Sequence, residues 1–404
     1  MKNPLFEYRS FQYFFLGRVA TTMASQMMMV VLAWQMYDLT NSAYDLGLVG
    51  LAQFLPSLAL TLIVGQVADR FDRRRVLAWC LTGQLLITIG LVTGTLGAWL
   101  NREAILIASI ALGSARAFQH PTQQALAPQL VPAAVLPRAL AVNASGTQAA
   151  IIVGPALGGF IYVAGADVVY MVCGALFLAA MGLVSIIRID HVPRTREPVS
   201  LQNLFAGIWF IWHRKEVLGA ISLDLFAVLL GGAVALLPIF AKDILHVGPW
   251  GLGLLRSAPA VGALLMSLYL AQQPIQRRVG KVMLGSVAMY GIATLVFALS
   301  TSFLLSLLAL AVTGMFDMVS VVVRQSLVQL ETPNEMRGRV SAVNSIFIGA
   351  SNQLGEFESG MTAGWFGAVP SVLIGGVGTL LVVGTWMKLF PELAKRDKLS
   401  TRNE

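Results

Sequence analysis

The sequence has few charged residues and almost no cysteine. Asp, Glu, Lys and Arg make up only 12% of the 404 residues, whereas 56% are hydrophobic. A soluble chain would carry about twice that charged fraction. The two cysteines, Cys80 and Cys173, both lie inside apolar runs, which favours core thiols over a disulfide or a redox centre. The composition therefore indicates a membrane protein.

Motifs for nucleotide hydrolysis and metal-dependent catalysis are also missing. The only Gly-Lys pair is Gly280-Lys281, and Val282 follows it, so the chain lacks the phosphate-binding G-x-x-x-x-G-K-[ST] loop. There is no His-Glu-x-x-His, no cysteine cluster and no convincing Ser/His/Asp grouping. We therefore expect no enzyme activity, no metal site and no cofactor. Any transport must then draw on an ion or substrate gradient.

Long apolar runs fill most of the chain. Crossing a bilayer takes about 20 residues, and backbone groups in lipid must bond within their own helix. The predicted fold is therefore an all-α membrane protein with twelve transmembrane helices. No cleavable signal is expected, because Met1 to Pro4 lead directly into the first span. We predict spans at approximately 11–37, 44–67, 76–98, 104–130, 139–164, 168–188, 217–241, 251–271, 282–300, 303–330, 340–365 and 370–390.

Basic residues gather in the termini and in every second loop. Only Arg102 and Lys242 lie in the odd-numbered loops. This asymmetry places both termini and the even-numbered loops in the cytoplasm. The net charge of +8 is therefore a topology signal, with lipid head groups rather than nucleic acid as its partner. The main clusters are Arg70, Arg73, Arg74 and Arg75; Arg188, Arg194, Arg196, Arg214 and Lys215; Arg277, Arg278 and Lys281; Arg337 and Arg339; and Lys395, Arg396 and Lys398.

The two halves of the chain repeat one another. The stretch 113–159 recurs without a gap at 314–360, and Arg116 of the first copy aligns with Asp317 of the second. The polar stretch 190–215 is the only one long enough to join two bundles. We predict two pseudo-symmetric six-helix bundles, at 1–189 and 216–404, and a cytoplasmic linker at 190–215 whose apolar part, 201–212, lies on the membrane surface. Identical residues of the repeat include Gly113/Gly314, Asn143/Asn344, Gly154/Gly355 and Gly159/Gly360.

Several motifs resemble the major facilitator superfamily. The loop from Gly65 to Arg75 is similar to the family's G-x-x-x-D-R-x-x-R-R-x, with Asp72 where glycine is usual. We expect Gly65 to end a helix and Asp69 to offer its carboxylate to a helix N-terminus or a cation. Arg70 and Arg73 would hold the loop at the cytoplasmic surface. The resemblance implies that this loop stabilises one conformation.

The resemblance extends along nearly the whole chain. Arg116 resembles the family's buried helix-4 arginine, which is associated with proton coupling. The run Gly154-Pro155-Ala156-Leu157-Gly158-Gly159 resembles the G-P-x-x-G-G motif of proton-coupled exporters. The opening Tyr8-Arg9-Ser10-Phe11 and the stretch 352–360 are similar to the drug:proton antiporter branch that contains macrolide efflux pumps and the enterobactin exporter. The resemblance implies a monomeric exporter in a bacterial inner membrane.

Charged residues inside the spans are candidate coupling sites, because a charge at membrane depth needs a partner or water. Arg18, Arg116, Asp224 and Asp317 lie on the four spans that line the central cavity in the family. We expect the two cations of the first half to pair with the two anions of the second half across this cavity and to act as a gate. The alternative is that such pairs only fix packing.

Glu356 and Glu358 are two residues apart, about 200° around a helix, so they cannot share a face. A carboxyl group held away from water keeps a proton more readily. Asp317 and Glu356 are therefore the preferred proton carriers, with Arg116 and Glu358 as further candidates, and Glu358 is equally compatible with a structural role. Methionine and polar side chains suit an amphipathic substrate, and the predicted cavity residues are Met23, Gln26, Met27, Gln119, His120, Gln123 and Asn344.

The sequence thus predicts a secondary active exporter that couples proton antiport to the export of amphipathic organic molecules, either drugs or siderophores, by alternating access. The expected partners are this substrate, protons and membrane lipids. One alternative is a lysolipid flippase or another transporter not coupled to protons. A second is a membrane scaffold or sensor that transports nothing.

Overall fold

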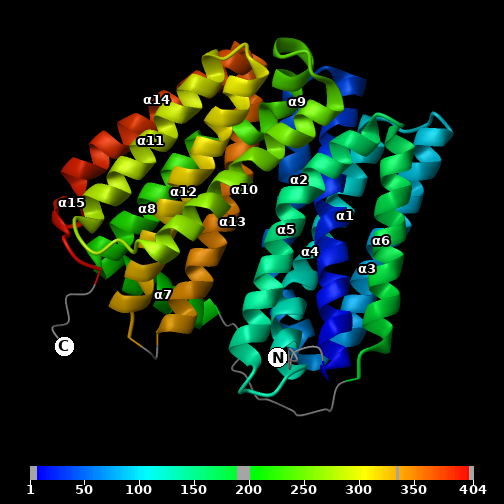
Figure 1. Ribbon diagram of the computed structural model, residues 1–404, viewed down its shortest axis with the longest axis horizontal. Coiled ribbons are helices and arrows are strands. Elements are labelled where there is room, and N and C mark those ends of the chain that lie inside the picture. Colours follow the sequence, from blue (N-terminus) through cyan, green and yellow to red (C-terminus); the bar gives the residue numbers. More distant parts are fainter. Residues whose placement is uncertain (1–6, 189–200, 334–335, 400–404) are drawn as a thin grey trace. The chain divides into compact units, whose positions relative to one another are not determined.

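The structure is a computed structural model that describes residues 7–188, 201–333 and 336–399. Side chains at 61–66, 68–70, 201–205 and 342 lie outside the described residues. Over the described part the chain is helical, without a strand (Figure 1). The first half contains α1 Arg9–Thr40, α2 Ala43–Arg70, α3 Arg73–Leu96, α4 Arg102–Leu126, η2 Ala127–Gln129, α5 Leu136–Tyr162 and α6 Ala166–Ile186. The second contains α7 Leu201–His213, α8 Lys215–Leu230, η3 Ala233–Leu236, α9 Leu237–Ile239, η4 Phe240–Ile244, α10 Gly248–Gln272, α11 Val279–Leu299, α12 Phe303–Glu331, α13 Arg337–Phe366, α14 Ala368–Leu389 and α15 Pro391–Lys395.

Twelve of these segments are membrane spans, as the sequence predicts. Ten are long and apolar enough to cross a bilayer within the described residues. The other two are α4 and α13, whose polar residues, among them Arg116 and Glu356, make them less apolar. Helix α7 has only 13 residues, too few to span a bilayer.

Local sequence signals set several helix ends. Asp72 precedes α3 and its carboxylate accepts a hydrogen bond from the backbone N–H of Arg74 at 2.9 Å. Asn101 caps α4 in the same way through the N–H of Ala104, also at 2.9 Å. Both are side-chain N-caps, which satisfy backbone donors that the first turn leaves unpaired. At the other end of α1, Asn41 takes the left-handed conformation with φ 47°, a common way to end a helix.

Two helix predictions from the sequence are wrong in detail. Gly65 does not end a helix, because α2 continues through it to Arg70. The span predicted at 217–241 is not one regular helix either: α8 ends at Leu230, and the chain passes through Gly231-Gly232 into short irregular turns. Two consecutive glycines weaken a helix. The backbone oxygen that the break releases at Gly231 accepts a hydrogen bond from the Tyr290 hydroxyl at 3.1 Å.

The chain forms two compact units. One contains Met1–Asn41, Leu51–Val199 and Gly248–Ser257, and the other contains Ser42–Gly50, Ser200–Val247 and Ala258–Glu404. The starts of α2 and α10 thus each pack with the unit that does not hold the rest of that helix. The predicted boundaries at 189 and 216 fall close to the main division and stay a prediction.

Equivalent helices pack alike in the two units. In the first unit α1 packs against α5 and α6, and α3 packs against α4 and α6 (Figure 1). In the second unit α8 packs against α13 and α14, and α11 packs against α12 and α14. Each unit is therefore a six-helix bundle with the same internal plan, which agrees with the predicted pseudo-symmetry.

The repeated glycines mark close helix crossings of this plan. A Cβ on Gly113 of α4 would collide with the backbone of Gln53 in α2, and one on Gly314 of α12 would collide with Pro259 in α10. Likewise, Gly154 of α5 abuts α1, and Gly355 of α13 abuts α8. Small residues allow helix backbones to approach closely in membranes. The repeated glycines therefore make equivalent helix contacts inside each of the two units.

Candidate functional site

A polar pocket lies inside the first unit, between α1, α4 and α5. Its volume is about 240 Å³. It brings together six residues that the sequence predicts as charged or substrate-binding groups: Arg18, Gln26, Arg116, Gln119, His120 and Gln123. Hydroxyl groups of Thr21, Thr22, Ser25 and Thr147 complete the polar lining. The pocket is thus rich in hydrogen-bonding groups at the depth of the membrane.

The charge of this pocket is positive. Arg18 and Arg116 both line it, and no carboxylate does. Arg116 donates a hydrogen bond to the Gln53 side-chain oxygen at 2.8 Å, while its buried Nε has no partner in the described structure. Arg256 of α10 also lies close enough to act electrostatically on Arg116. Such a pocket attracts anionic groups and hydrogen-bond acceptors.

A neighbouring helix fixes one of the pocket's polar side chains. Gln84 of α3 donates to the Gln119 side-chain oxygen at 2.7 Å, and both residues are buried. His120 lies one turn from Gln124, and the two side chains meet at 3.4 Å. Gln119 is therefore held in place, whereas His120 is exposed within the pocket region.

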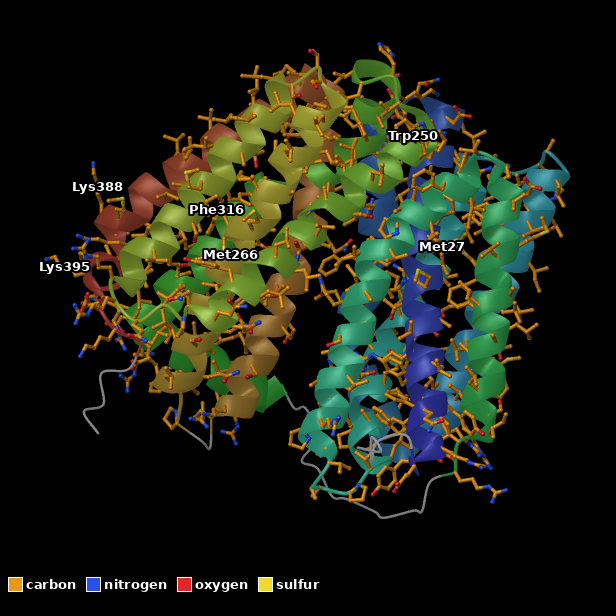
Figure 2. All side chains as sticks on the ribbon, in the orientation of Figure 1. Met27, Trp250, Met266, Phe316, Lys388 and Lys395 are labelled. Carbon is orange, nitrogen blue, oxygen red and sulfur yellow. The ribbon has the colours of Figure 1, made fainter. Side chains whose placement is uncertain are left out.

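Three predicted cavity residues do not line this pocket, and two of them, Met23 and Met27, lie on α1. Met27 is only 1% exposed and packs against Gly158 of α5, so it belongs to the core of the first unit rather than to a substrate cavity. Met23 is half-buried, and its backbone oxygen faces Gly154. Small residues on α5 bring α1 close enough to bury Met27. Figure 2 labels Met27 on α1.

Asn344 belongs to the second unit and does not line this pocket. It is 8% exposed and its side-chain oxygen has no hydrogen-bond partner among the described residues. The same holds for Asn143, its counterpart in the repeat, which is 5% exposed. Helices α5 and α13 therefore carry identical buried asparagines at equivalent positions. The alignment of the two halves of the sequence already pairs these two residues.

The second unit contains a buried ion pair. Arg324 of α12 contacts Asp224 of α8 at 2.7 Å, and their side chains are only 3% and 6% exposed. The expectation that Asp224 pairs with a cation of the first half is therefore wrong. Arg324 lies two turns from Asp317 along α12, so it faces α8 as Asp317 does. Because Arg324 lies near the end of its predicted span, the sequence did not indicate that it pairs with Asp224.

Asp317 lies beside this pair without joining it. It lines a cavity of about 10 Å³ with Asp224, Tyr290 and Ser320, which is about the room one water molecule needs. Asp317 makes no hydrogen bond or ion pair with the described residues, although Asp224 and Arg324 act on it electrostatically. Ser320 is 2% exposed and its hydroxyl has no partner in the described structure. The site therefore places an unpaired carboxyl group next to an ion pair.

The two glutamates of α13 face different surroundings. Glu358 accepts a hydrogen bond from the Thr362 hydroxyl at 2.7 Å and a longer one from Ser359 at 3.5 Å. Glu356 points to the start of α2, where its Oε2 lies 2.8 Å from the place that a Cβ on Gly50 would take. Glu358 thus bonds within its own helix, as a structural role requires, and Glu356 occupies a helix crossing.

The two remaining motifs lie at helix contacts. Arg73 donates to the Ala125 carbonyl at 3.3 Å, and its neighbour Arg74 donates to the Ile187 carbonyl at 3.0 Å. These bonds tie the start of α3 to the ends of α4 and α6. The predicted side-chain roles of Gly65, Asp69 and Arg70 lie outside the described side chains.

In the second motif, Gly154 and Gly158 face α1, and Gly159 with Pro155 faces the start of α10. A Cβ on Gly158 would stand 2.9 Å from the Cα of Met27. The motif therefore forms two close helix contacts on adjacent faces of α5, about 100° apart.

Two helical bundles with charged residues in their interiors define a multi-pass membrane transporter. Residues 14–356 match the Major Facilitator Superfamily. The chain belongs to this family, and it is a transporter rather than an enzyme or a scaffold.

Curated relatives match along almost the whole chain. The enterobactin exporter EntS of Citrobacter koseri is 27% identical over 402 residues, which cover 96% of this chain and 93% of that protein. The multidrug efflux pump Tap of Mycobacterium tuberculosis is 28% identical over 367 residues, or 86% of each chain. A solved bacterial homologue of the human lysosomal transporter Spinster, inward-facing and unoccupied, has a TM-score of 0.77 at 13% identity and covers 98% of this chain and 99% of its own. The likeness to the Spinster homologue shows the fold. The similarity to EntS and Tap indicates the branch of the family that contains drug and siderophore exporters.

Proposed function

We propose that this transporter is a proton-coupled exporter of amphipathic organic molecules, drugs or siderophores, in a bacterial inner membrane. The observation that carries the proposal is the unpaired Asp317 carboxyl group beside the Asp224–Arg324 ion pair. The positive pocket of the first unit supports it, as do the EntS and Tap relatives. The protein works as a monomer with both termini in the cytoplasm, and it needs no cofactor other than the proton gradient.

The coupling step uses competition for one guanidinium group. When Asp317 is protonated, Arg324 pairs with Asp224 alone. When Asp317 loses its proton, two carboxylates compete for Arg324, and like charges at close range are unfavourable. Proton binding and release therefore alter the contact between α8 and α12, the helices that hold these residues. A contact with two arrangements is what alternating access requires.

The substrate binds in the positive pocket of the first unit. Arg18 and Arg116 supply charge, and Gln119, Gln123 and Gln26 supply amide donors and acceptors. Met29 and Ile151 give the pocket an apolar side. An amphipathic molecule with acidic or oxygen-rich groups fits this combination better than a permanent cation does.

Transport by purified protein in proteoliposomes with an imposed pH gradient tests the proposal. A multidrug substrate, a catecholate siderophore and a lysolipid are each tested, with a pH-sensitive dye inside the vesicles. We expect substrate movement to follow the pH gradient. The Asp317→Asn variant should lose this dependence while keeping exchange of substrate across the membrane.

The matched control is Glu103→Gln, which neutralises an exposed carboxylate at the start of α4. It should behave as the unmodified protein does. A pH-gradient response that persists in Asp317→Asn would rule out this residue as the proton carrier. Lysolipid movement that ignores the gradient would favour the flippase alternative.

A further inference from the structure

A second, larger pocket lies in the second unit, and neither Asp317 nor a residue of the Asp224–Arg324 ion pair lines it. Its volume is about 520 Å³, and α10, α11, α12 and the loop between α10 and α11 form its walls. Figure 2 labels Met266 of α10 and Phe316 of α12, which both line it. None of the predicted coupling or substrate residues takes part in it.

The pocket has an apolar end and a polar end. Met266, Leu270, Met289, Phe316 and Val319 form apolar walls within the spans. The polar end is the loop between α10 and α11, where Gln273, Gln276 and Arg277 line the opening. The pocket is therefore amphipathic along the axis of the membrane, with its polar end at the membrane surface.

The depth of the pocket matches one leaflet of a bilayer. From Lys281 to Met289, eight residues of α11 rise about 12 Å at 1.5 Å each. Half of a bilayer's hydrocarbon core is about 15 Å thick. Tyr269 and Met289 are 61% and 38% exposed along this wall, so the apolar wall is open at the depth of the acyl chains.

The polar end of the pocket, where Arg277 lines the opening, and the residues that follow it in the chain are positively charged. Arg277, Arg278 and Lys281 are exposed, and none of the three makes an ion pair with a residue that the structure describes. One carboxylate is close: Asp397 accepts a hydrogen bond from the backbone N–H of Arg278 at 3.0 Å. Three cations against one anion leave a net positive charge there, which attracts the phosphate of an anionic lipid.

We propose that this pocket is a binding site for one anionic phospholipid of the adjoining leaflet. The acyl chain lies between α10 and α11 against Phe316, and the phosphate group lies at Arg277 with Gln273 and Gln276 as hydrogen-bond donors. The volume falls in the usual range for ligand pockets, about 300–1,000 Å³.

Gly285 provides a direct way to block the site. It lines the pocket, and a Cβ there would meet nothing within 4 Å. A Gly285→Phe side chain can therefore enter the pocket without disturbing the helix packing. Gly384 of α14 has equally open surroundings and does not line the pocket. Gly384→Phe is thus a matched control.

Native mass spectrometry of the full chain, titrated with palmitoyl-oleoyl phosphatidylglycerol or phosphatidylcholine, tests the proposal. We expect the phosphatidylglycerol adduct to form at about a tenfold lower lipid concentration than the phosphatidylcholine adduct, because the polar end is cationic. Gly285→Phe should lose this adduct, and Gly384→Phe should keep it. Arg277→Gln combined with Lys281→Gln changes only exposed side chains, and it should reduce the preference to about threefold or less.

Equal binding of the two lipids by the unmodified protein would overturn the proposal. So would unchanged phosphatidylglycerol binding in Gly285→Phe, or an unchanged preference in the Arg277→Gln/Lys281→Gln variant. The charge variant tests the site even where the glycine variant fails to fold, because its two positions are exposed.

Discussion

Arg324 and Asp224 show how a buried charge is accommodated in this protein. Each would be costly alone at membrane depth, and they contact each other at 2.7 Å with almost no exposure. Removing one partner leaves the other charge buried and unpaired, which costs more than the pair itself contributes. The pair therefore fixes α8 against α12. The neighbouring Asp317 interacts electrostatically with both members of this pair.

The single variants Asp224→Asn and Arg324→Gln should each destabilise the protein by about 3–5 kcal/mol, the usual cost of breaking a buried pair. The double variant should recover a large part of that loss, because no unpaired charge remains. Unfolding of the detergent-solubilised protein by heat or denaturant gives the three values. Additive losses in the double variant would contradict the coupling.

Sequence alone identified the charged residues but not all of their partners. Arg18, Arg116, Gln119, His120 and Gln123 meet in one pocket, because their spacing along α1 and α4 follows the helical repeat. The partner of Asp224 was missed, since pairing depends on which faces of α8 and α12 meet, and one sequence carries no such information. Met27 was misplaced for the same reason: glycines on α5 decide its burial.

At the scale of elements, glycines set how closely the helices cross. Gly113 and Gly314 occupy equivalent crossings of α4 with α2 and of α12 with α10. Because both face the backbone of another helix rather than a flexible side chain, a larger residue cannot be accommodated by a rotamer change. Backbone shifts are then required.

Gly113→Leu and Gly314→Leu should therefore each destabilise the protein by about 1–3 kcal/mol or more, as overpacking does. Gly182→Leu is the control, since Gly182 of α6 is exposed and a Cβ there would meet nothing within 4 Å. Thermal unfolding in detergent compares the three variants. A stable Gly314→Leu protein would mean that α10 and α12 can separate without cost.

The chain after α14 is a second element with a defined role in packing. Arg396 is 7% exposed and bonds the carboxylates of Glu216 at the start of α8 and Glu331 at the end of α12. Leu393 is 1% exposed and joins the core cluster of the second unit. The segment that follows α14 thus connects the start of α8 to the end of α12 in the second unit.

Arg396→Ala should destabilise the second unit by about 3 kcal/mol, because two carboxylates then lose their shared cation. The loss should persist at 0.5 M salt, since buried pairs are screened little. Lys395, labelled in Figure 2, is the exposed neighbour, and Lys395→Ala should have no effect. A loss of stability that salt abolishes would place Arg396 in solvent.

On the scale of the whole molecule, the even number of predicted spans leads us to expect both chain ends on one side of the membrane. The distribution of arginine and lysine predicts that this side is the cytoplasm. The number of spans and the half-chain repeat could be read from the sequence, because apolar length and internal identity are both local features. The interruption of α8 at Gly231-Gly232 was not predicted, although two consecutive glycines weaken a helix. The close approach of α13 to Gly232 is visible only in the structure.

Fusions of a fluorescent protein and of a periplasm-dependent phosphatase to each terminus test the orientation. We expect fluorescence and no phosphatase activity at both ends. Replacement of Arg73, Arg74 and Arg75 by glutamine should weaken this preference, because basic residues near the spans set the orientation. Phosphatase activity at either end of the unmodified protein would reverse the assignment.

Helices α4 and α13 are the least apolar of the twelve spans, and this has a consequence for biosynthesis. A nascent segment enters lipid from the translocon according to its own apolar content. Each of these two segments needs an apolar neighbour to stay in the membrane. Helix α4 emerges after α3, with which it packs, and α13 emerges before α14, with which it packs. The ribosome must therefore deliver each as part of a helical hairpin, and the helices that hold Arg116 and Glu356 settle only once their neighbours are in place.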